Sequence, residues 1–354
     1  MLRDLTIQNY RAFKDFSIDG LARVNLIVGD NNSGKTSFLE AVYLLINGGS
    51  PAAVIEVLDN REDFVIDVAP DTLRGSIRYH VAHIFHERAS GVEQDIRIRL
   101  RSGSESALET TMGVYPRTEP NGPPLKLVSQ HTSAPDALGR TTGQDNLPLD
   151  AGYNYASERR FSRANEGKSR AHFLTVGSAN FEELADLWDR VIRTPDKETI
   201  VIRALQVLER RIEDVRFTTK RTAGGTFVRL AQQPARVTVS SLGEGIRRLL
   251  ALSLAAVTSE KGVLLVDEID TGLYHGAQAD MWRLLIETAQ RLDIQIFATT
   301  HSWDCVAAFG EALETVEPGV GRLFRLETRN GKMRSVIYEA DELAIAVRET
   351  IEVR

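Results

Sequence analysis

The sequence predicts an α/β fold that carries an antiparallel β lobe and a helical insertion. An apolar strand runs into a glycine-rich loop and an apolar helix over residues 24–45, and residues 243–330 alternate helices with apolar strands. Between them, residues 74–115 contain three short alternating runs typical of antiparallel strands. With 354 residues, 42% of them hydrophobic, the chain is long enough for two domains or one enlarged core.

The loop over residues 29–36 carries the first chemical signal. Its sequence, GDNNSGKT, fits the pattern G-x-x-x-x-G-K-[ST], in which successive backbone N–H groups turn inward around a triphosphate. Lys35 would supply a positive charge to the β- and γ-phosphates, and Thr36 a hydroxyl to Mg²⁺. The strand before this loop and the helix after it are where that chemistry needs them, so we predict a nucleotide-binding P-loop. The predicted binding residues are Gly29, Asn31, Asn32, Ser33, Gly34, Lys35, Thr36 and Ser37.

Residues 262–270 read GVLLVDEID, in which four apolar residues precede two carboxylates. A buried strand that ends in Asp267 and Glu268 would bring Asp267 within reach of Mg²⁺, together with Thr36. Glu268 could then polarise the attacking water. An apolar strand ending in acids is common by chance, but after a phosphate loop it predicts a site that hydrolyses nucleotides.

A third strand end follows in IFATTHSWD, residues 296–304, where Thr299, Thr300 and His301 leave an apolar run. A histidine at such a position can hydrogen-bond a γ-phosphate and report its presence. Alone, His301 would be read as a structural loop histidine. Its order after the acidic strand favours a catalytic role.

The segment SSLGEGIRRLL, residues 240–250, precedes the acidic strand and predicts an anion site. A Ser-x-Gly-Glu turn at the start of a helix presents a hydroxyl, free N–H groups and the positive end of the helix dipole. The alternative is a serine that merely caps the helix. One chain cannot easily place two phosphate cradles on one γ-phosphate, so the second cradle would serve another copy.

The order of these motifs resembles the ATP-binding-cassette (ABC) ATPases, and more narrowly the branch with SMC proteins, RecF-type recombination ATPases and overcoming-lysogenization-defect (OLD) nucleases. The opening LTIQNYRAFKDFSIDGLARVNLIVGDNNSGKTSFLEAV is the most specific evidence, and LLVDEIDTGLYH and ATTHSWD resemble the end of that family. The resemblance covers residues 1–48 and 238–310 strongly and the middle only in general layout. It implies the fold of a P-loop NTPase, an ABC-type head.

The resemblance also implies ATP and Mg²⁺ as ligands and a homodimer that forms on ATP binding. In such a dimer, Ser241, Gly243 and Glu244 of one subunit close on the γ-phosphate held by Lys35 of the other. Arg11 matches the family arginine that lies near the nucleotide.

Several positions depart from the family pattern. The signature reads Ser-Leu-Gly-Glu rather than the transporter form with paired glycines, Ile269 replaces a frequent proline, and Tyr274 stands where histidine is frequent. The glutamine of the Q-loop has two weak candidates, Gln130 and Gln144.

The chain divides on these patterns into four parts. Residues 1–115 form lobe I with the phosphate loop and an antiparallel β subdomain, and 116–178 form a loop-rich connector, because six of the eleven prolines fall within 116–150. Residues 179–234 form an insertion with two helices and a hairpin, and 235–354 form lobe II with the signature, the acidic strand and the switch histidine.

Composition limits the partners and the cellular location that we expect. The net charge of −6 gives no overall electrostatic footprint for nucleic acid, so any such surface must be local; the best candidate is the basic segment 157–170, which could equally be a solvated loop. No stretch is long and apolar enough for a bilayer span, and the charged start does not fit a signal peptide, so we expect a cytoplasmic protein without a membrane partner. The single cysteine, Cys305, is expected to be buried and inert.

Two weaker signals stay open between structure and function. Three histidines, His80, His83 and His86, recur at every third residue, but no cysteine or paired carboxylate completes a metal site, so structural roles are favoured. Arg247 and Arg248 could steady an interface or face solvent.

The favoured function is an SMC/RecF/OLD-like ATPase that dimerises on ATP and couples hydrolysis to DNA or to a separate effector. OLD proteins carry a C-terminal nuclease domain, whereas few residues follow His301 here and none form D-x-D, so we expect the nuclease or toxin on another chain. Resemblance to ATPases that sense phage or DNA damage suggests antiviral defence or DNA repair. The alternatives are a transporter's ATPase subunit and a scaffold that binds ATP without hydrolysing it.

Overall fold

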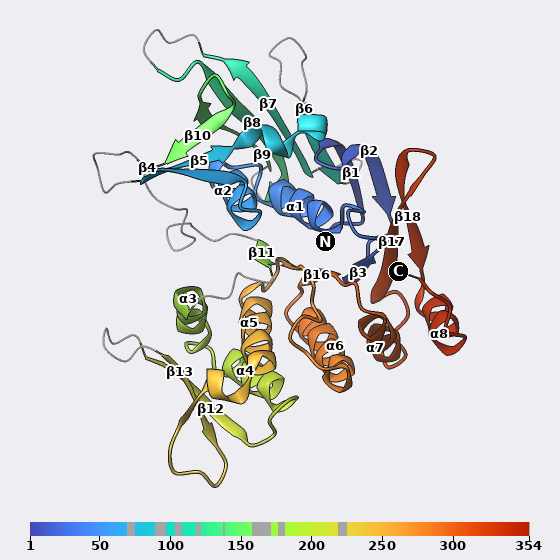
Figure 1. Ribbon diagram of the computed structural model, residues 1–354. Coiled ribbons are helices and arrows are strands. Elements are labelled where there is room, and N and C mark those ends of the chain that lie inside the picture. Colours follow the sequence, from blue (N-terminus) through green and yellow to red (C-terminus); the bar gives the residue numbers. More distant parts are fainter. Residues whose placement is uncertain are drawn as a thin grey trace.

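The computed structural model describes residues 1–68, 75–88, 97–102, 108–117, 122–136, 139–157, 171–175, 181–218 and 225–353. A six-stranded sheet lies at the centre (Figure 1), in the order β11-β15-β16-β3-β17-β18. All neighbours pair in parallel except the terminal hairpin β17-β18. The strands are Ala171–Leu174 (β11), Val263–Val266 (β15), Gln295–Thr299 (β16), Val24–Val28 (β3), Gly321–Arg329 (β17) and Lys332–Tyr338 (β18).

The parallel strands explain where the motifs meet. Every residue of β3, β15 and β16 is buried, as expected for strands covered on both faces. Because parallel strands end at the same edge of a sheet, the segments that follow these three strands gather there. They are the phosphate loop, the acidic pair and the segment with His301.

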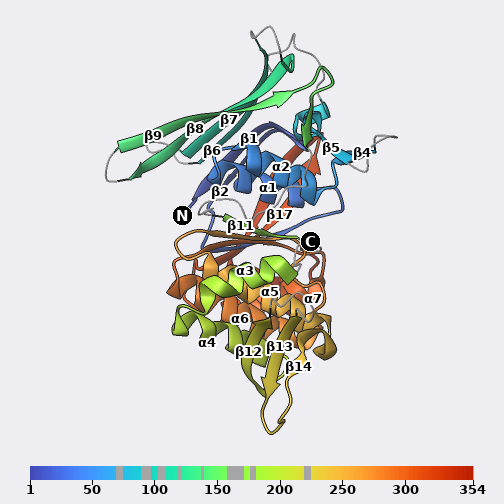
Figure 2. The ribbon, with the colours of Figure 1, turned by 90° about the vertical axis from the view of Figure 1, so that its left-hand side faces the viewer.

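Helices cover both faces of the central sheet (Figure 2). Helices α1 and α2 lie on one side, whereas α3 to α7 lie on the other; α8 packs against α7 and the last hairpin. The helices are Lys35–Ile46 (α1), Pro51–Asn60 (α2), Phe181–Val191 (α3), Pro195–Gln206 (α4), Glu244–Thr258 (α5), His275–Arg291 (α6), Trp303–Leu313 (α7) and Ala340–Arg348 (α8). In the described parts of the chain, no helix is both long and apolar enough to cross a bilayer.

A second six-stranded sheet, wholly antiparallel, covers the outer side of α1, in the order β2-β1-β6-β7-β8-β9. Its apolar face and α1 share one core with Phe297 and Phe324 of the central sheet, while the lower helices form a second core around Trp282. Helix α1 is therefore buried between two sheets. The strands are Asp4–Tyr10 (β1), Phe13–Asp19 (β2), Arg97–Ser102 (β6), Leu108–Pro116 (β7), Leu125–Asp136 (β8) and Gly139–Leu149 (β9).

Two three-stranded sheets flank this arrangement. One has the order β10-β5-β4 and lies beside α2; the other, β12-β13-β14, belongs to the insertion and lies at the far end of the helical layer (Figure 1). Two short 3₁₀ turns matter for the site, Val81–Ile84 after β5 and Val239–Leu242 before α5. The strands are Phe64–Val68 (β4), Gly75–His80 (β5), Asn154–Ser157 (β10), Ile212–Thr218 (β12), Gly225–Leu230 (β13) and Val237–Thr238 (β14).

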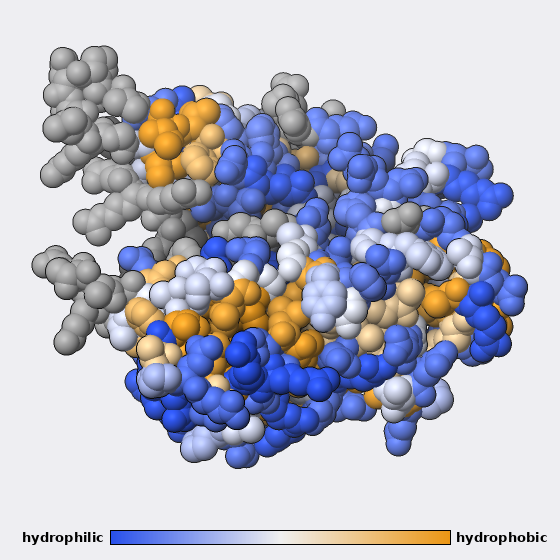
Figure 3. Space-filling model, turned by 60° about the horizontal axis from the view of Figure 1, so that its bottom comes forward, coloured by the Kyte–Doolittle hydropathy of each residue, from blue (hydrophilic) through white to orange (hydrophobic). Residues whose placement is uncertain are grey.

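The surface of the helical layer is mainly hydrophilic, with apolar side chains gathered in a band between two hydrophilic areas (Figure 3). Single exposed apolar residues are normal on folded proteins. Tyr274, 61% exposed, and Ile345, 55% exposed, are among the larger ones.

The expected long loop over 116–150 is wrong for most of its length, because β8 and β9 form a hairpin there. Alternating apolar residues, including Leu125 and Leu127, are buried against the core. The prolines misled the prediction: Pro116 ends β7, and Pro148 lies in β9, an edge strand, where a missing N–H is tolerated. The four-part division of the chain remains a proposal.

Other elements differ in extent. Strand β5 stops at His80, where the 3₁₀ turn begins. Helix α4 ends at Gln206, and Ile212 already pairs in β12. Helix α2 was not predicted, although Ser50, whose side chain accepts from Ala53 N–H, and the following proline are a typical helix start. The two helices and the hairpin expected in the insertion are confirmed.

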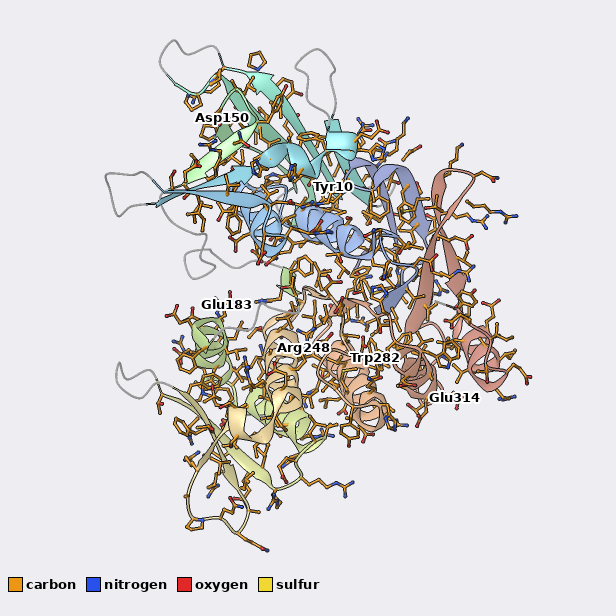
Figure 4. The ribbon with its side chains drawn as sticks, in the orientation of Figure 1. Tyr10, Asp150, Glu183, Arg248, Trp282 and Glu314 are labelled. Carbon is orange, nitrogen blue, oxygen red and sulfur yellow. The ribbon has the colours of Figure 1, made fainter. Side chains whose placement is uncertain are left out.

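Trp282 anchors the lower core and gives a test of its packing. Its ring lies on α6 (Figure 4) and is fully buried. The ring centroid is 4.7 Å from that of Phe309 on α7. We expect Trp282→Ala to lower the free energy of unfolding by about 3–5 kcal/mol and Trp282→Phe to cost less, since a smaller ring leaves a smaller cavity. Urea denaturation followed by circular dichroism measures both. Equal losses in the two variants would contradict this packing.

Candidate functional site

The phosphate loop follows β3 and leads directly into α1. Gly29, Asn32 and Gly34 all have positive φ, at 143°, 62° and 87°, which folds the loop back on itself. Asparagine tolerates such a conformation better than most residues. Gly34 caps α1 without any side-chain hydrogen bond. The N–H groups of this helix start therefore remain available to an anion.

Neighbouring elements fit closely around the loop. A Cβ atom on Gly29 would lie 2.4 Å from the carbonyl oxygen of Leu326 on β17, so only glycine fits there. A Cβ on Gly34 would lie 3.1 Å from Phe13 Cζ and 3.5 Å from Met333 Sδ. The loop is thus bordered by the N-terminal β1-β2 turn and by the C-terminal hairpin.

Lys35 is buried, and its Nζ donates to the carbonyl oxygens of Gly29 and Asp30, each at 2.8 Å. Burial lowers the pKa of this ammonium, while the carboxylates of Asp267, Asp30 and Glu268 act in the opposite direction. The ammonium therefore lies inside the loop and near the acidic pair, as predicted for a phosphate-binding lysine.

The Asp267 carboxylate joins two of the predicted motifs. Thr36 Oγ1 donates to its Oδ2 at 2.8 Å, and Thr299 Oγ1 donates to its Oδ1 at 2.5 Å. The structure therefore brings Thr36 and Asp267 together, as expected for a pair that binds Mg²⁺. Thr299, fully buried at the end of β16, contributes the second contact.

Glu268 has an unusual backbone, with φ at +48°. Such a conformation costs on the order of 1 kcal/mol or more for a residue with a side chain, and it is often found at active sites. Its N–H donates to Thr299 Oγ1 at 2.9 Å, and its Oε2 accepts from Thr271 Oγ1 at 3.3 Å. Neighbouring hydroxyls therefore hold the predicted catalytic carboxylate in place.

His301 follows β16 at the same edge of the sheet, and its side chain is exposed. The adjoining Thr300 is fully buried and donates to Asp270 Oδ1 at 2.5 Å. Ser302 then caps α7 by accepting from Cys305 N–H. These contacts fix the chain on both sides of His301, whose catalytic role remains a prediction.

The signature residues lie at the surface. Ser241, Gly243 and Glu244 are all exposed, and Gly243 begins α5 with φ at 99° and no side-chain cap. Ser241 Oγ donates to Thr238 O at 2.7 Å and does not accept from the first turn of α5, whose N-cap residue is Gly243, so the alternative of a capping serine is not what the structure shows. Arg247 is exposed and pairs with Glu244, whereas Arg248 is buried.

Arg11 lies in the β1-β2 turn, with φ at 45°, and forms ion pairs with Glu40 at 2.8 Å and Asp63 at 3.0 Å. Burial tends to lower its pKa, but Glu40, Tyr10 and Asp63 outweigh burial and raise it. Its Nη2 is buried without a partner among the described residues. Phe13, two residues after Arg11, borders the phosphate loop. The place of Arg11 beside the nucleotide remains a prediction.

Glu40 is a site residue that the sequence reasoning missed. It is 1% exposed on α1 and accepts from Tyr10 Oη at 3.0 Å and from Arg61 Nε at 2.7 Å, in addition to Arg11. Arg61 also donates to Ser37 Oγ at 3.2 Å, which ties the network to the loop. The available signal was one acidic residue inside the apolar run FLEAVYLL.

The two glutamines considered for the Q-loop lie away from the phosphate loop. Gln130 on β8 pairs with Gln144 on β9. The residue after Gln130, His131, lies against Gly48, which follows the C-terminal end of α1. A helix of 12 residues is about 18 Å long, so neither glutamine is near the phosphate loop. Of the basic segment 157–170, residues 158–170 lie outside the described residues.

The three histidines have structural partners. His80 Nδ1 lies 2.8 Å from Asn154 Oδ1, His83 Nδ1 lies 2.9 Å from Asp63 Oδ1, and His86 Nδ1 lies 2.7 Å from Arg11 O. No cluster of three metal-ligating side chains occurs in the described part of the chain. Cys305 is buried, and burial raises its pKa to about 12, which suits an inert thiol.

These residues fit ATP with Mg²⁺. Ser33 Oγ is buried in the loop without a partner in the described structure, the start of α1 has no side-chain cap, and Lys35 Nζ lies within the loop. Thr36 and Asp267 offer the oxygen ligands that Mg²⁺ prefers.

A solved SMC head bound to the C-winged helix domain of ScpA has the same fold. It aligns with 97% of this chain and 99% of its own, at a TM-score of 0.52 and 12% identity. Together, the fold, the P-loop and the acidic pair define a P-loop NTPase fold of the ABC type, similar to the head of SMC proteins.

The chain belongs to the family described as "AAA domain, putative AbiEii toxin, Type IV TA system", which matches residues 24–304. An "ATP/GTP phosphatase" of Helicobacter pylori is 19% identical over 351 residues, covering 88% of each protein. A "DNA replication and repair protein RecF" of Idiomarina loihiensis is 43% identical over 49 residues, or 14% of each chain.

Thr299 provides a test of how the acidic pair is held. We expect Thr299→Val to lower the free energy of unfolding by about 1–3 kcal/mol, because the partly buried N–H of Glu268 loses its acceptor. Thr299→Ser keeps the hydroxyl and is the matched control, with a smaller loss. Thermal unfolding measures both. A valine variant as stable as the serine variant would show that this hydroxyl contributes nothing.

Asp63 predicts an acid-dependent stability. Burial raises its pKa, but the hydrogen bond from His83 and the charge of Arg11 outweigh burial and lower it below the usual 3.8. A carboxyl with a lowered pKa stabilises the fold above its unfolded pKa, and this contribution is lost as the pH falls through the folded pKa. We therefore expect Asp63→Asn to cost about 1–3 kcal/mol at pH 7, and the difference from wild type to shrink below about pH 4.

Urea denaturation at pH 7, 5, 4 and 3 measures this difference. Asp293→Asn is the control, because Asp293 pairs with Arg23 while 69% exposed, and exposed pairs contribute about 0–1 kcal/mol. A constant difference between wild type and Asp63→Asn at every pH would contradict the assignment.

Proposed function

We propose that this protein hydrolyses ATP with Mg²⁺, and that two copies associate head to tail when they bind ATP. The observation that carries the proposal is the hydrogen bond between Thr36 and Asp267, next to Glu268. It joins the nucleotide-binding loop to the acidic strand within one subunit. The H. pylori relative, whose name states a phosphatase of ATP and GTP, supports the same activity.

The residues of the site divide the reaction between them. Lys35 and the N–H groups at the start of α1 would hold the phosphates, and Thr36 and Asp267 would bind Mg²⁺. When bound, Mg²⁺ supplies charge neutralisation on the phosphate oxygens. Glu268, held by Thr271 and by its own N–H, would polarise the attacking water, and His301 would contact the γ-phosphate.

The exposed signature supports the dimer. The uncapped start of α5 presents Ser241, Gly243 and Glu244 to solvent, so a second subunit can reach them. Tyr274, in the turn after the acidic strand, is also exposed and would add apolar surface to such a contact.

We propose further that the dimer acts through DNA or through a separate effector chain, such as a nuclease or toxin, in the cytoplasm, in phage defence or DNA repair. The family description names a toxin system, and the SMC head in the related structure is bound to part of another protein. The short match to RecF supports a repair setting.

The dimer is tested with Glu268→Gln, which should bind ATP without hydrolysing it. We expect ATP with Mg²⁺ to double the mass of this variant from that of the 39.3 kDa monomer, as measured by size-exclusion chromatography with light scattering. Ser241→Arg in the same background should abolish the shift, because its side chain would occupy the place of the phosphate. Thr199→Arg, at an exposed position of α4, is the control and should leave the shift intact.

An unchanged mass, while ATP binding is demonstrated by equilibrium dialysis, would reject the composite site for this chain alone. Phosphate release by the wild-type protein tests hydrolysis separately. If the wild type dimerises on ATP and releases no phosphate, the protein is a scaffold rather than an ATPase.

A further inference from the structure

Arg248 is buried on α5, and its hydrogen bonds within the described part of the chain are to backbone oxygens near the acidic pair. Its Nη1 donates to Thr175 O at 3.0 Å, and its Nη2 donates to Asp267 O at 2.9 Å and to Glu268 O at 3.1 Å. Figure 4 shows Arg248 on α5, beneath the central sheet. Its side chain is 6% exposed. One guanidinium therefore joins the ends of β11 and β15 to the helix that begins at the signature.

The start of α5 also packs tightly on the turn after the acidic pair. A Cβ atom on Gly245 would lie 2.9 Å from Gly272 O, and one on Gly272 would lie 3.5 Å from Glu244 Cγ. The approach at Gly245 is too close for a side chain, and Gly272 has a φ of +80°, which favours glycine. The close contact at Gly245 leaves little room for α5 to move independently of that turn.

The backbone at Glu268 needs such support. Its positive φ is unfavourable for a residue with a side chain, so the conformation persists only where surrounding contacts fix it. The N–H of Glu268 is held by Thr299, from the same sheet. Its carbonyl is held by Arg248, which comes from the signature helix.

We propose that Arg248 is a positioning residue that transmits the position of the signature helix to Glu268 of the same subunit. When a second subunit's phosphate engages the start of α5, Arg248 moves with the helix and sets the backbone of the catalytic carboxylate. In this way, engagement of a subunit's signature would be transmitted to the hydrolytic site of the same subunit. This inference rests on the dimer proposed above.

An arginine suits this role better than a lysine. Its planar fork reaches three carbonyl oxygens at once, whereas an ammonium is a point charge on a flexible stem. Burial lowers the pKa of Arg248, while the facing carboxylates of Asp267, Asp270, Glu268 and Glu244 act in the opposite direction. The guanidinium is thus surrounded by acids and remains charged.

The test compares binding with turnover in Arg248→Gln. We expect kcat for phosphate release to fall about 10- to 100-fold, because a small displacement of a catalytic group is that costly. The Kd for ATP should stay within about twofold, since Arg248 does not contact the phosphate loop. ATP-driven dimerisation in the Glu268→Gln background should persist. Arg203→Gln, which removes an exposed pair with Glu287, is the control and should leave kcat unchanged.

Arg248→Lys separates positioning from folding. We expect this variant to fold as the wild type does and to show a kcat between those of wild type and Arg248→Gln. A kcat equal to that of wild type would show that the charge alone suffices, which overturns the proposal. So would a loss of kcat that merely matches the fraction of unfolded protein, measured by circular dichroism.

A double-mutant cycle with Ser241→Ala tests the transmission itself. If Arg248 transmits the state of the signature, the double variant should be slower than wild type by less than the product of the two single factors. Independent, multiplicative effects would overturn it. Failure of the wild type to dimerise or to release phosphate would instead reject the proposed function, so the two failures can be distinguished.

Discussion

The polar groups of Asp267 hold three strands and two helices at one point. Its carboxylate accepts from Thr36 at the start of α1 and from Thr299 at the end of β16. Its N–H donates to Leu174 in β11, and its carbonyl accepts from Arg248 on α5. The phosphate loop, the acidic pair and the signature helix therefore share one residue, and the geometry of the site depends on it.

The sequence predicted the parts of the site that are local in the chain. The glycines and Lys35 follow from one loop, and Asp267 and Glu268 follow from one strand end, because their chemistry requires a fixed spacing. The parallel order of β3, β15 and β16 then follows from three mainly apolar runs, all of whose residues are buried. Local patterns were therefore enough to assemble the edge of the sheet that carries the candidate site.

The contacts that support the site could not be predicted in the same way. Glu40 and Arg248 are charged residues inside apolar helices, and their partners are distant in sequence: Arg11 and Arg61 for Glu40, and three backbone carbonyls for Arg248. Nothing near Arg248 in sequence distinguishes it from its exposed neighbour. The strands β8 and β9 were missed for another reason. Only one face of this hairpin is buried, so apolar residues are needed at every second position alone, and prolines and polar residues obscure that pattern.

The phosphate loop, near the N-terminus, has its walls at both ends of the chain. Phe13 borders Gly34 from one side, whereas Leu326 and Met333, on the last hairpin, border the loop from the other. Strand β3 itself lies between β16 and β17. During synthesis at about 5–20 residues per second, the loop is therefore made on the order of 15–60 s before the hairpin that forms its second wall. A nascent chain cannot enclose this loop fully until β17 and β18 have left the ribosome.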